Sequence, residues 1–441
     1  MSNTVGTFPF CGCKKVVSIL TTTRFIWSSF CLAGYRIRSG FNRLFMVSNI
    51  SLTSGDAPRS VDVPGLDGGE SARSGASSHG CAVARINRGS WEERVVTAPG
   101  MSLCEILDEW GEGVSPVCAD LFGTPHELQV LEKILVDRFP SLPRTRVAVS
   151  RDGHGGAVFH AVKGVEVGYA ALAGGAMCSR VEFPEGVQVV LSGLKARDPV
   201  LPPAAQTGDI LEQVVEALSE QGMGLADTVR TWFYNRDILD WYLPFNAMRT
   251  THFLRNGVLR MPASTGVGTN GTMNPAITAK VSAIRFSEAG TRISEAESPL
   301  QCHAFSYGSA FSRGILISTP SSRIVHVSGT AAIEPDGKSA HEGDPASQIE
   351  LTLRVIEALL EKSGMGLHQT TRAIAYFPDP GHAVLLADAL VRRGLRKFPL
   401  VVVPATICRG DLLFEMELDA SDPAEISGDF SRHAPILNYA K

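Results

Sequence analysis

The sequence predicts an α+β protein that contains two tandem copies of one domain, and two observations lead to this fold class. Residues 210–225 and 352–367 are versions of the same segment, because both carry apolar residues at helical spacing and both end in Gly-Met-Gly-Leu. A run rich in β-branched and aromatic residues follows each copy, at 227–234 and 369–376. Each copy therefore predicts a helix that ends at a glycine and leads into a buried strand.

A further strand is expected ahead of each helix. Residues 188–193 and 325–329 are short apolar runs that both end in glycine. The repeated unit is therefore strand, loop, helix and strand. Pro202-Pro203 and the charged loop over 287–297 are typical of boundaries inside and between the units.

The segment before the repeats holds other elements. Thr124 precedes Pro125 and a run with Leu128, Leu131 and Leu135 on one face, which predicts a helix with Thr124 as its N-cap. This segment has no visible copy elsewhere in the chain. We therefore divide the sequence into an N-terminal lead-in (1–84), an N-terminal α/β extension (85–155), a degenerate first copy (156–290), a second copy (298–422) and a C-terminal tail (423–441).

The lead-in differs from the rest of the chain. Its first 45 residues contain six Lys and Arg and no Asp or Glu, which is typical of a targeting segment. Arg24 interrupts the apolar stretch, however, and no cleavage signal of small residues follows it. An overextended start, with translation beginning near Met46, is the other interpretation. Residues 47–80 are rich in Ser, Gly, Asp and Pro and are expected to be disordered.

Composition restricts the class of protein. The net charge is −4, with 20% charged residues and no basic stripe, so a nucleic-acid partner is not expected, and neither is a membrane. Nine cysteines without a CxxC pair favour a reducing, cytoplasmic location. The sequence has no phosphate loop and no metal motif, so we expect no cofactor and no metal. Gly266–Gly271 matches a dinucleotide glycine pattern but lacks the required helix after it, and we interpret it as a turn between strands.

The segment from Leu412 to Asp419 alternates between apolar and acidic residues. Glu415 and Glu417 share one face of the strand that this alternation predicts. One interpretation is a half-exposed strand with a solvated acidic face, and the other is a catalytic acid. In the first copy, Ala279 or a neighbour takes the position of Glu415, so the two copies differ where chemistry would occur.

Four features of the second copy resemble one protein superfamily. They are Tyr307-Gly-Ser-Ala-Phe near its start, Val327-Ser-Gly329 on an early strand, the helix stop at Gly364 and the Glu415-Met-Glu417 strand. Together they resemble the RidA/YjgF (endoribonuclease L-PSP) superfamily. The resemblance implies two tandem RidA-like (chorismate-mutase-like) domains, each a mixed β-sheet with two helices on one face.

The chain departs from the imine deaminases of this superfamily at one position. Those enzymes carry an arginine after a Phe-Pro-Ala or similar turn, where it holds the substrate carboxylate. This chain has Val401 there in the second copy and Ser264 in the first. A RidA-type enamine or imine deaminase is therefore an alternative, and so is a non-catalytic metabolite-binding protein.

The tandem arrangement is similar to that of the chorismatases, in which a cysteine or smaller residue lies seven positions before an essential glutamate. Cys408 and Glu415 have this spacing. The resemblance implies an enzyme that protonates the enolpyruvyl group of chorismate and releases pyruvate, giving a hydroxybenzoate or a dihydroxycyclohexadiene carboxylate. Glu415 would be the general acid. Cys408 is either a small apolar filler or the residue that directs the ring toward 3-hydroxybenzoate.

The anionic substrate that this resemblance implies needs cationic partners. Arg313 and Arg409 are candidates for its carboxylates, because guanidinium binds carboxylate bidentately, and Tyr307 would line the pocket. Arg230 and Arg372 recur in both copies, and we interpret them as structural. RidA-like domains usually form trimers, so a homotrimer or a pseudo-trimeric assembly is expected.

Overall fold

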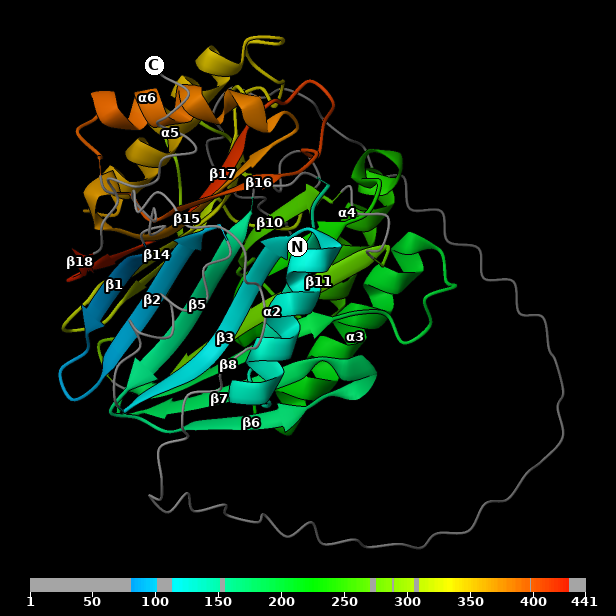
Figure 1. Cartoon of the computed structure of the whole chain (residues 1–441), viewed down its shortest axis with the longest axis vertical. Coiled ribbons are helices and arrows are strands. Elements are labelled where there is room, and N and C mark those ends of the chain that lie inside the picture. The colour runs from blue at the N-terminus through cyan, green and yellow to red at the C-terminus, as the bar shows by residue number, and fades with distance from the viewer. Residues whose placement is uncertain are drawn as a thin grey trace, which may run out of the picture. The chain divides into compact units, whose positions relative to one another are not determined.

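The computed structural model describes residues 81–100, 113–150, 155–269, 275–287, 289–304, 309–396 and 398–427. These residues form three six-stranded mixed sheets and five α-helices (Figure 1). Within this described part, no helix combines the length and the apolar character that crossing a bilayer requires. The α+β class and the mixed sheets predicted from the sequence are confirmed.

The N-terminal sheet has the strand order β18-β1-β2-β5-β3-β4. Its helix α2 begins with the predicted cap, because the Thr124 side chain accepts from the backbone of Glu127 and the Glu127 side chain accepts from the backbone of Thr124. The elements are β1 (Ala82–Asn87), β2 (Glu92–Pro99), β3 (Val114–Gly123), α2 (Pro125–Arg138), β4 (Arg144–Ala148), β5 (Gly156–Lys163) and β18 (Glu425–Ser427).

The middle sheet has the order β6-β7-β8-β11-β9-β10. Its helix α3 stops as predicted, because Gly222 adopts a left-handed conformation with φ 69°. The elements are β6 (Val167–Ala171), β7 (Met177–Phe183), β8 (Gly186–Leu194), α3 (Pro203–Glu220), β9 (Thr228–Asn235), α4 (Ile238–Arg255), β10 (Ala263–Gly268) and β11 (Ile277–Phe286). Gly266 thus lies within a strand, and the interpretation of its motif as a turn is wrong at this residue.

The C-terminal sheet has the order β12-β13-β14-β17-β15-β16. Gly364 ends its helix α5 with φ 73°, as Gly222 ends α3. The elements are β12 (Arg292–Ala296), β13 (Gly314–Ser318), β14 (Arg323–Ala331), α5 (Pro345–Lys362), β15 (Thr370–Phe377), α6 (Ala383–Arg392), β16 (Leu400–Pro404) and β17 (Glu415–Asp422). Short 3₁₀ helices lie at Ala173–Gly175, Leu225–Asp227, Leu367–Gln369 and Pro380–His382.

The three sheets share one topology, so the N-terminal extension is a third unit of the same kind. In each sheet the last two strands are parallel and the others antiparallel. Strand β5 pairs with β2 and β3. The boundary between the N-terminal and the middle units therefore lies after Lys163 and not at residue 155. Strand β12 pairs with β13, and β18 from the tail pairs with β1. The C-terminal unit therefore begins before residue 298, and part of the C-terminal tail pairs with the N-terminal sheet.

The units follow each other around an approximate threefold axis. β10 packs against β14, β16 against β2, and β4 against β8, so the last strand of each sheet meets the third strand of the next. Helices cover the outer faces: α5 and α6 share an apolar core with the C-terminal sheet, and α3 and α4 with the middle sheet. Two further apolar clusters combine side chains from all three sheets on their inner faces.

The strand registers define equivalent positions in the three units. Glu415 lies opposite Tyr376, Thr278 opposite Tyr234, and Gly156 opposite Phe122. The counterpart of Glu415 in the first predicted copy is therefore Thr278, a neighbour of Ala279. Only one of the three equivalent positions carries an acid.

Candidate active site

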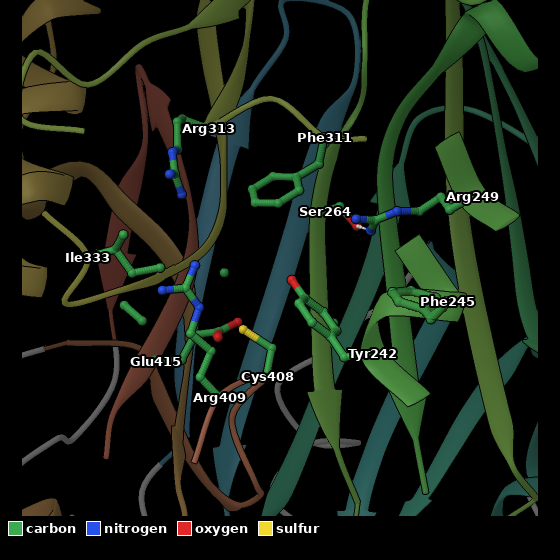
Figure 2. Close-up of a pocket in the computed structure, with 13 residues that line it drawn as sticks. Tyr242, Phe245, Arg249, Ser264, Phe311, Arg313, Ile333, Cys408, Arg409 and Glu415 are labelled. Atoms are coloured by element: carbon green, nitrogen blue, oxygen red, sulfur yellow. Dashed lines mark hydrogen bonds between the residues drawn. The ribbon is translucent and has the colours of Figure 1, made fainter. Parts of the chain in front are cut away.

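A cavity with about 500 Å³ of empty space, including the part open to solvent, lies between the middle and the C-terminal sheets (Figure 2). Four of the five residues predicted for the site line it: Glu415, Cys408, Arg313 and Arg409. The fifth, Tyr307, lies outside the described residues. The remaining lining residues are Tyr242, Phe245, Arg249, Ser264, Gly266, Phe311, Gly329, Ala331 and Ile333.

Glu415 begins strand β17, and its side chain is only 5% exposed. Burial raises the pKa of this carboxyl to about 8, and the charge of Glu417 adds to the rise, whereas Arg230 and Arg313 oppose it. The carboxyl group is therefore mostly protonated at pH 7. It can donate a proton into the cavity.

Gly329 on β14 leaves the space that the acid occupies. A Cβ atom added at Gly329 would clash with Oε1 of Glu415 and lie 3.0 Å from its carboxyl carbon. The backbone N–H of Gly329 donates to Oγ1 of Thr265 at 3.1 Å, which holds β14 against β10 of the middle sheet. A glycine is required here because of the close approach to Glu415.

Glu417 lies on the same face of β17 but belongs to a buried ion-pair network. Its side chain is 0% exposed and accepts from Arg230 at 2.8 Å, Arg372 at 2.9 Å and the indole N–H of Trp232 at 2.9 Å. The interpretation of a solvated acidic face is therefore wrong for both glutamates. Arg230 and Arg372, which the repeats suggested to be structural, hold Glu417 behind the acid.

Cys408 lines the cavity as a neutral thiol. Burial, followed by the charge of Glu415, raises its pKa to about 12, although a hydrogen bond with Tyr242 opposes the rise. At neutral pH this cysteine is therefore not a thiolate and is a poor nucleophile. Its half-buried side chain presents a small, weakly polar surface beside the acid.

Three guanidinium groups border the cavity. Nε of Arg313 donates to the carbonyl oxygen of Cys302 at 3.1 Å, and Nη1 of Arg409 donates to that of Gly337 at 2.7 Å. Arg249, on α4, lies across the cavity from these two arginines (Figure 2). The site thus has cationic groups on two sides and a neutral acid among the residues that line it.

Arg249 was not predicted from the sequence. It is 2% exposed, and its Nη1 and Nη2 donate to Oγ of Ser264 at 3.0 Å and Oδ1 of Asn246 at 2.7 Å. Ser264 is the position at which the superfamily resemblance implies an arginine in the imine deaminases, and Arg249 contacts it from the neighbouring helix α4. The spacing of Tyr242, Phe245 and Arg249, three and four residues apart on one helix face, was the available signal.

Metal ligation is not suggested by the described residues, which contain no group of three or more His, Cys, Asp and Glu side chains arranged around a common point. The chemistry available from the side chains themselves is proton donation by Glu415 and carboxylate binding by arginine.

Comparison with known proteins gives a consistent result. No protein-family model matches the chain. A chorismatase from Streptomyces rapamycinicus is 30% identical over 222 residues, which are 44% of this chain and 64% of that protein. The crystal structure of a chorismatase matches with a TM-score of 0.53 at 21% identity, covering 69% of this chain and 93% of the other. RidA from an Antarctic Psychrobacter covers 25% of this chain and 86% of its own at 18% identity, with a TM-score of 0.22.

The aligned region thus spans somewhat less than two thirds of the Streptomyces chorismatase, whereas the structural match covers nearly all of the crystallised chorismatase. The predicted tandem architecture agrees with the fold of the crystallised chorismatase. The chain is therefore similar to a chorismatase in part of its sequence and shares the chorismatase fold.

Proposed function

We propose that this protein is an enzyme that releases pyruvate from chorismate, with Glu415 as the proton donor. The observation that carries the proposal is a buried, protonated carboxyl group in a cavity bordered by three arginines. The similarity to a chorismatase supports the choice of substrate.

The charge of the cavity selects a dianion. Arg249, Arg313 and Arg409 each carry a positive charge, whereas Glu415 is mostly neutral at pH 7. Chorismate has two carboxylates, one on the ring and one on the enolpyruvyl arm. Arginines on two sides of the cavity would hold the two carboxylates apart and leave the arm near Glu415 (Figure 2).

The proposed reaction begins with transfer of the Glu415 proton to the methylene carbon of the enol ether. The electron pair of the carbon–carbon double bond forms the new C–H bond, and the neighbouring carbon becomes an oxocarbenium ion. The carboxylate left on Glu415 stabilises this cation. Addition of water followed by C–O cleavage gives pyruvate and a dihydroxycyclohexadiene carboxylate, and loss of water from the ring gives a hydroxybenzoate.

Cys408 would influence which product forms. Its thiol stays protonated beside the acid. It therefore presents an uncharged surface to the ring intermediate and does not act as a base. We propose that Cys408 directs the intermediate toward 3-hydroxybenzoate. Replacing it in Cys408→Ala should change the ratio of hydroxybenzoate to diene-diol, measured by liquid chromatography. An unchanged ratio would leave Cys408 as a packing residue.

The deciding experiment follows pyruvate with a lactate dehydrogenase coupled assay. The wild-type chain, Glu415→Gln and the control Glu361→Gln, which changes an exposed acid on α5, are each mixed with chorismate. We expect pyruvate from the wild type and from the control, and a rate about 10²–10⁴-fold lower from Glu415→Gln. No pyruvate from the wild type, or full activity in Glu415→Gln, would refute the proposal.

A further inference from the structure

A second space opens at the threefold axis, away from the candidate active site. We call one part the vestibule, with about 620 Å³ of empty space, and the other the axial chamber, with about 520 Å³, and both volumes include space open to solvent. Glu93, Gln188 and His326 line both, so the two spaces adjoin. Neither shares a lining residue with the candidate active site.

The vestibule has an aromatic wall and a polar rim. Trp91 stacks on Phe183 with ring centroids 5.0 Å apart, and Phe286 meets Phe183 edge-on at 5.8 Å. The rim on the opposing hairpin carries Ser321 and Ser322. Such a wall accommodates a flat apolar group.

The axial chamber contains pairs of opposite charges contributed by all three sheets. Lys280 contacts Asp120 at 2.7 Å, and Nε of Arg372 donates to Asp419 at 2.5 Å. His326 shares Asp419 at 2.8 Å. The side chains of these residues line a space that is polar but buried.

A third pair completes the balance of charge. His160 lies 2.9 Å from Glu93. Burial lowers the pKa of His160, but hydrogen bonds with Cys118 and Glu93 outweigh burial and raise it to about 9, so this pair is ionic at neutral pH. Apart from His326, the charged side chains that line the chamber are the cations Lys280, Arg372 and His160 and the anions Asp120, Asp419 and Glu93, so they are equal in number. A ligand without net charge is therefore favoured.

Three buried polar atoms of the residues that line the chamber have no hydrogen-bond partner among the described residues. One is Nε2 of His160, which still has Glu93 beside it as an ion-pair partner at 2.9 Å. The other two are Oδ1 of Asp120, a residue 2% exposed, and Nη2 of Arg372, a residue 5% exposed. Of these two, Oδ1 is an acceptor with negative charge and Nη2 a donor with positive charge. Together they match a ligand that carries both an ammonium and a carboxylate group.

We propose that the axial chamber and the vestibule form a second ligand site for an aromatic α-amino acid. Its ammonium would bind Asp120, its carboxylate would bind Arg372, and its ring would lie against Trp91 and Phe183. This site does not depend on the proposed function, because none of its lining residues belongs to the candidate active site.

Isothermal titration calorimetry tests the proposal on the Glu415→Gln full chain, so that turnover does not interfere. The probes are L-phenylalanine and L-tryptophan, with 3-phenylpropanoate, 2-phenylethylamine and L-alanine as analogues that each lack one of the three groups. We expect the aromatic amino acids to bind at least tenfold more tightly than every analogue. No binding of either amino acid at 5 mM, or equal binding of an analogue, would overturn the proposal.

Two variants test the location. Ser321→Trp, at an exposed rim position, should block the vestibule without disturbing the core, and Asp120→Asn should remove the partner of the ammonium. Either change should weaken binding at least tenfold, whereas Arg249→Ala in the other cavity should not. If Ser321→Trp binds as tightly as its parent, or if Arg249→Ala abolishes binding, the amino acid lies elsewhere and the proposal fails.

Discussion

Glu415 illustrates how its surroundings can adapt an ordinary carboxyl group to the proposed role of proton donor. The carboxyl group is buried, lies near the negative charge of Glu417, and has a pKa of about 8. Arg230 and Arg313 moderate this rise but do not reverse it. The proton that the proposed reaction needs is therefore present at neutral pH, which a carboxyl group in water does not provide.

The first prediction concerns the pH dependence of activity. Because the protonated form of Glu415 is required, kcat/KM for pyruvate release should be highest below pH 8 and should fall as the pH rises through about 8. Initial rates between pH 6 and 10 measure this. A profile that is flat over this range would contradict the role of Glu415 as the acid.

The second prediction concerns stability. The pKa of Glu415 is raised on folding from 4.5 to about 8, so between these values the folded state binds more protons than the unfolded state. The free energy of unfolding of the protein therefore decreases as the pH rises through this window. Glu415 contributes on the order of 1.4 kcal/mol per pH unit to this decrease. Glu415→Gln should be more stable than the wild type at pH 8 and about equal at pH 4.5, measured by urea unfolding with Glu361→Gln as the control.

The third prediction concerns Gly329. In Gly329→Ala the new methyl group would clash with Oε1 of Glu415 and move the acid from its place in the cavity. Pyruvate release should fall about tenfold or more, since a displacement of about 1 Å can cost 10²-fold. Gly224→Ala is the matched control, because a Cβ atom there meets nothing within 4 Å. Equal activity of the two variants would show that the acid has room to adjust.

The sequence could suggest Glu415 and Cys408 because they lie seven residues apart in one copy. The spacing of Tyr242 and Arg249 shows only that they share a helix face, and it could not show that they enter the cavity, which depends on α4 of the middle unit packing beside the C-terminal sheet. Nor could alternation show that Glu417 is buried. A strand with one polar face is typical of an exposed sheet. Here the middle sheet packs against this face and buries Glu417.

At the level of the elements, a fully buried ion pair of Glu417 with Arg230 links the middle and C-terminal sheets. It joins β17 to β9 and has 0% exposure on both sides. Arg372 and Trp232 complete the hydrogen bonds of the carboxylate. A buried pair of this kind contributes less to stability than the loss of one partner costs.

The fourth prediction follows from this asymmetry. Glu417→Ala leaves Arg230 and Arg372 buried without their shared anion and should lower the free energy of unfolding by about 3–5 kcal/mol. The double variant Arg230→Met with Glu417→Leu should lose less free energy of unfolding, because it removes one positive and one negative charge together. Urea unfolding of both variants makes the comparison, and a double variant as unstable as the single one would count against this account.

Helix positions were predictable because their signals are local. Thr124 marks the start of α2 through the hydrogen bond that its side chain accepts. Gly222 marks the end of α3 through its left-handed backbone conformation. The third unit was not predictable, because the N-terminal extension lacks the Gly-Met-Gly-Leu segment and only strand pairing shows the shared topology. The return of β18 to β1 joins residues 340 to 344 positions apart, beyond the reach of any periodic pattern.

For the molecule as a whole, three sheets in one chain already complete the threefold arrangement. The inner faces are buried against each other by two clusters that draw on every unit. We therefore propose that the chain is a pseudo-trimer and not one subunit of a homotrimer. Light scattering after size exclusion should give a mass near 47.2 kDa. A mass three times larger would favour the homotrimer instead.

The shared strand registers have a consequence for how such a protein could diverge. Glu417, Lys280 and Val158 occupy equivalent places, opposite Ile374, Trp232 and Asp120. In an assembly of identical subunits, any charge introduced at this position would appear three times around the axis and repel its own copies. Fusion into one polypeptide removes that constraint. Natural selection can then set an anion, a cation and an aliphatic residue side by side, and can specialise one interface while the other two serve only as scaffold.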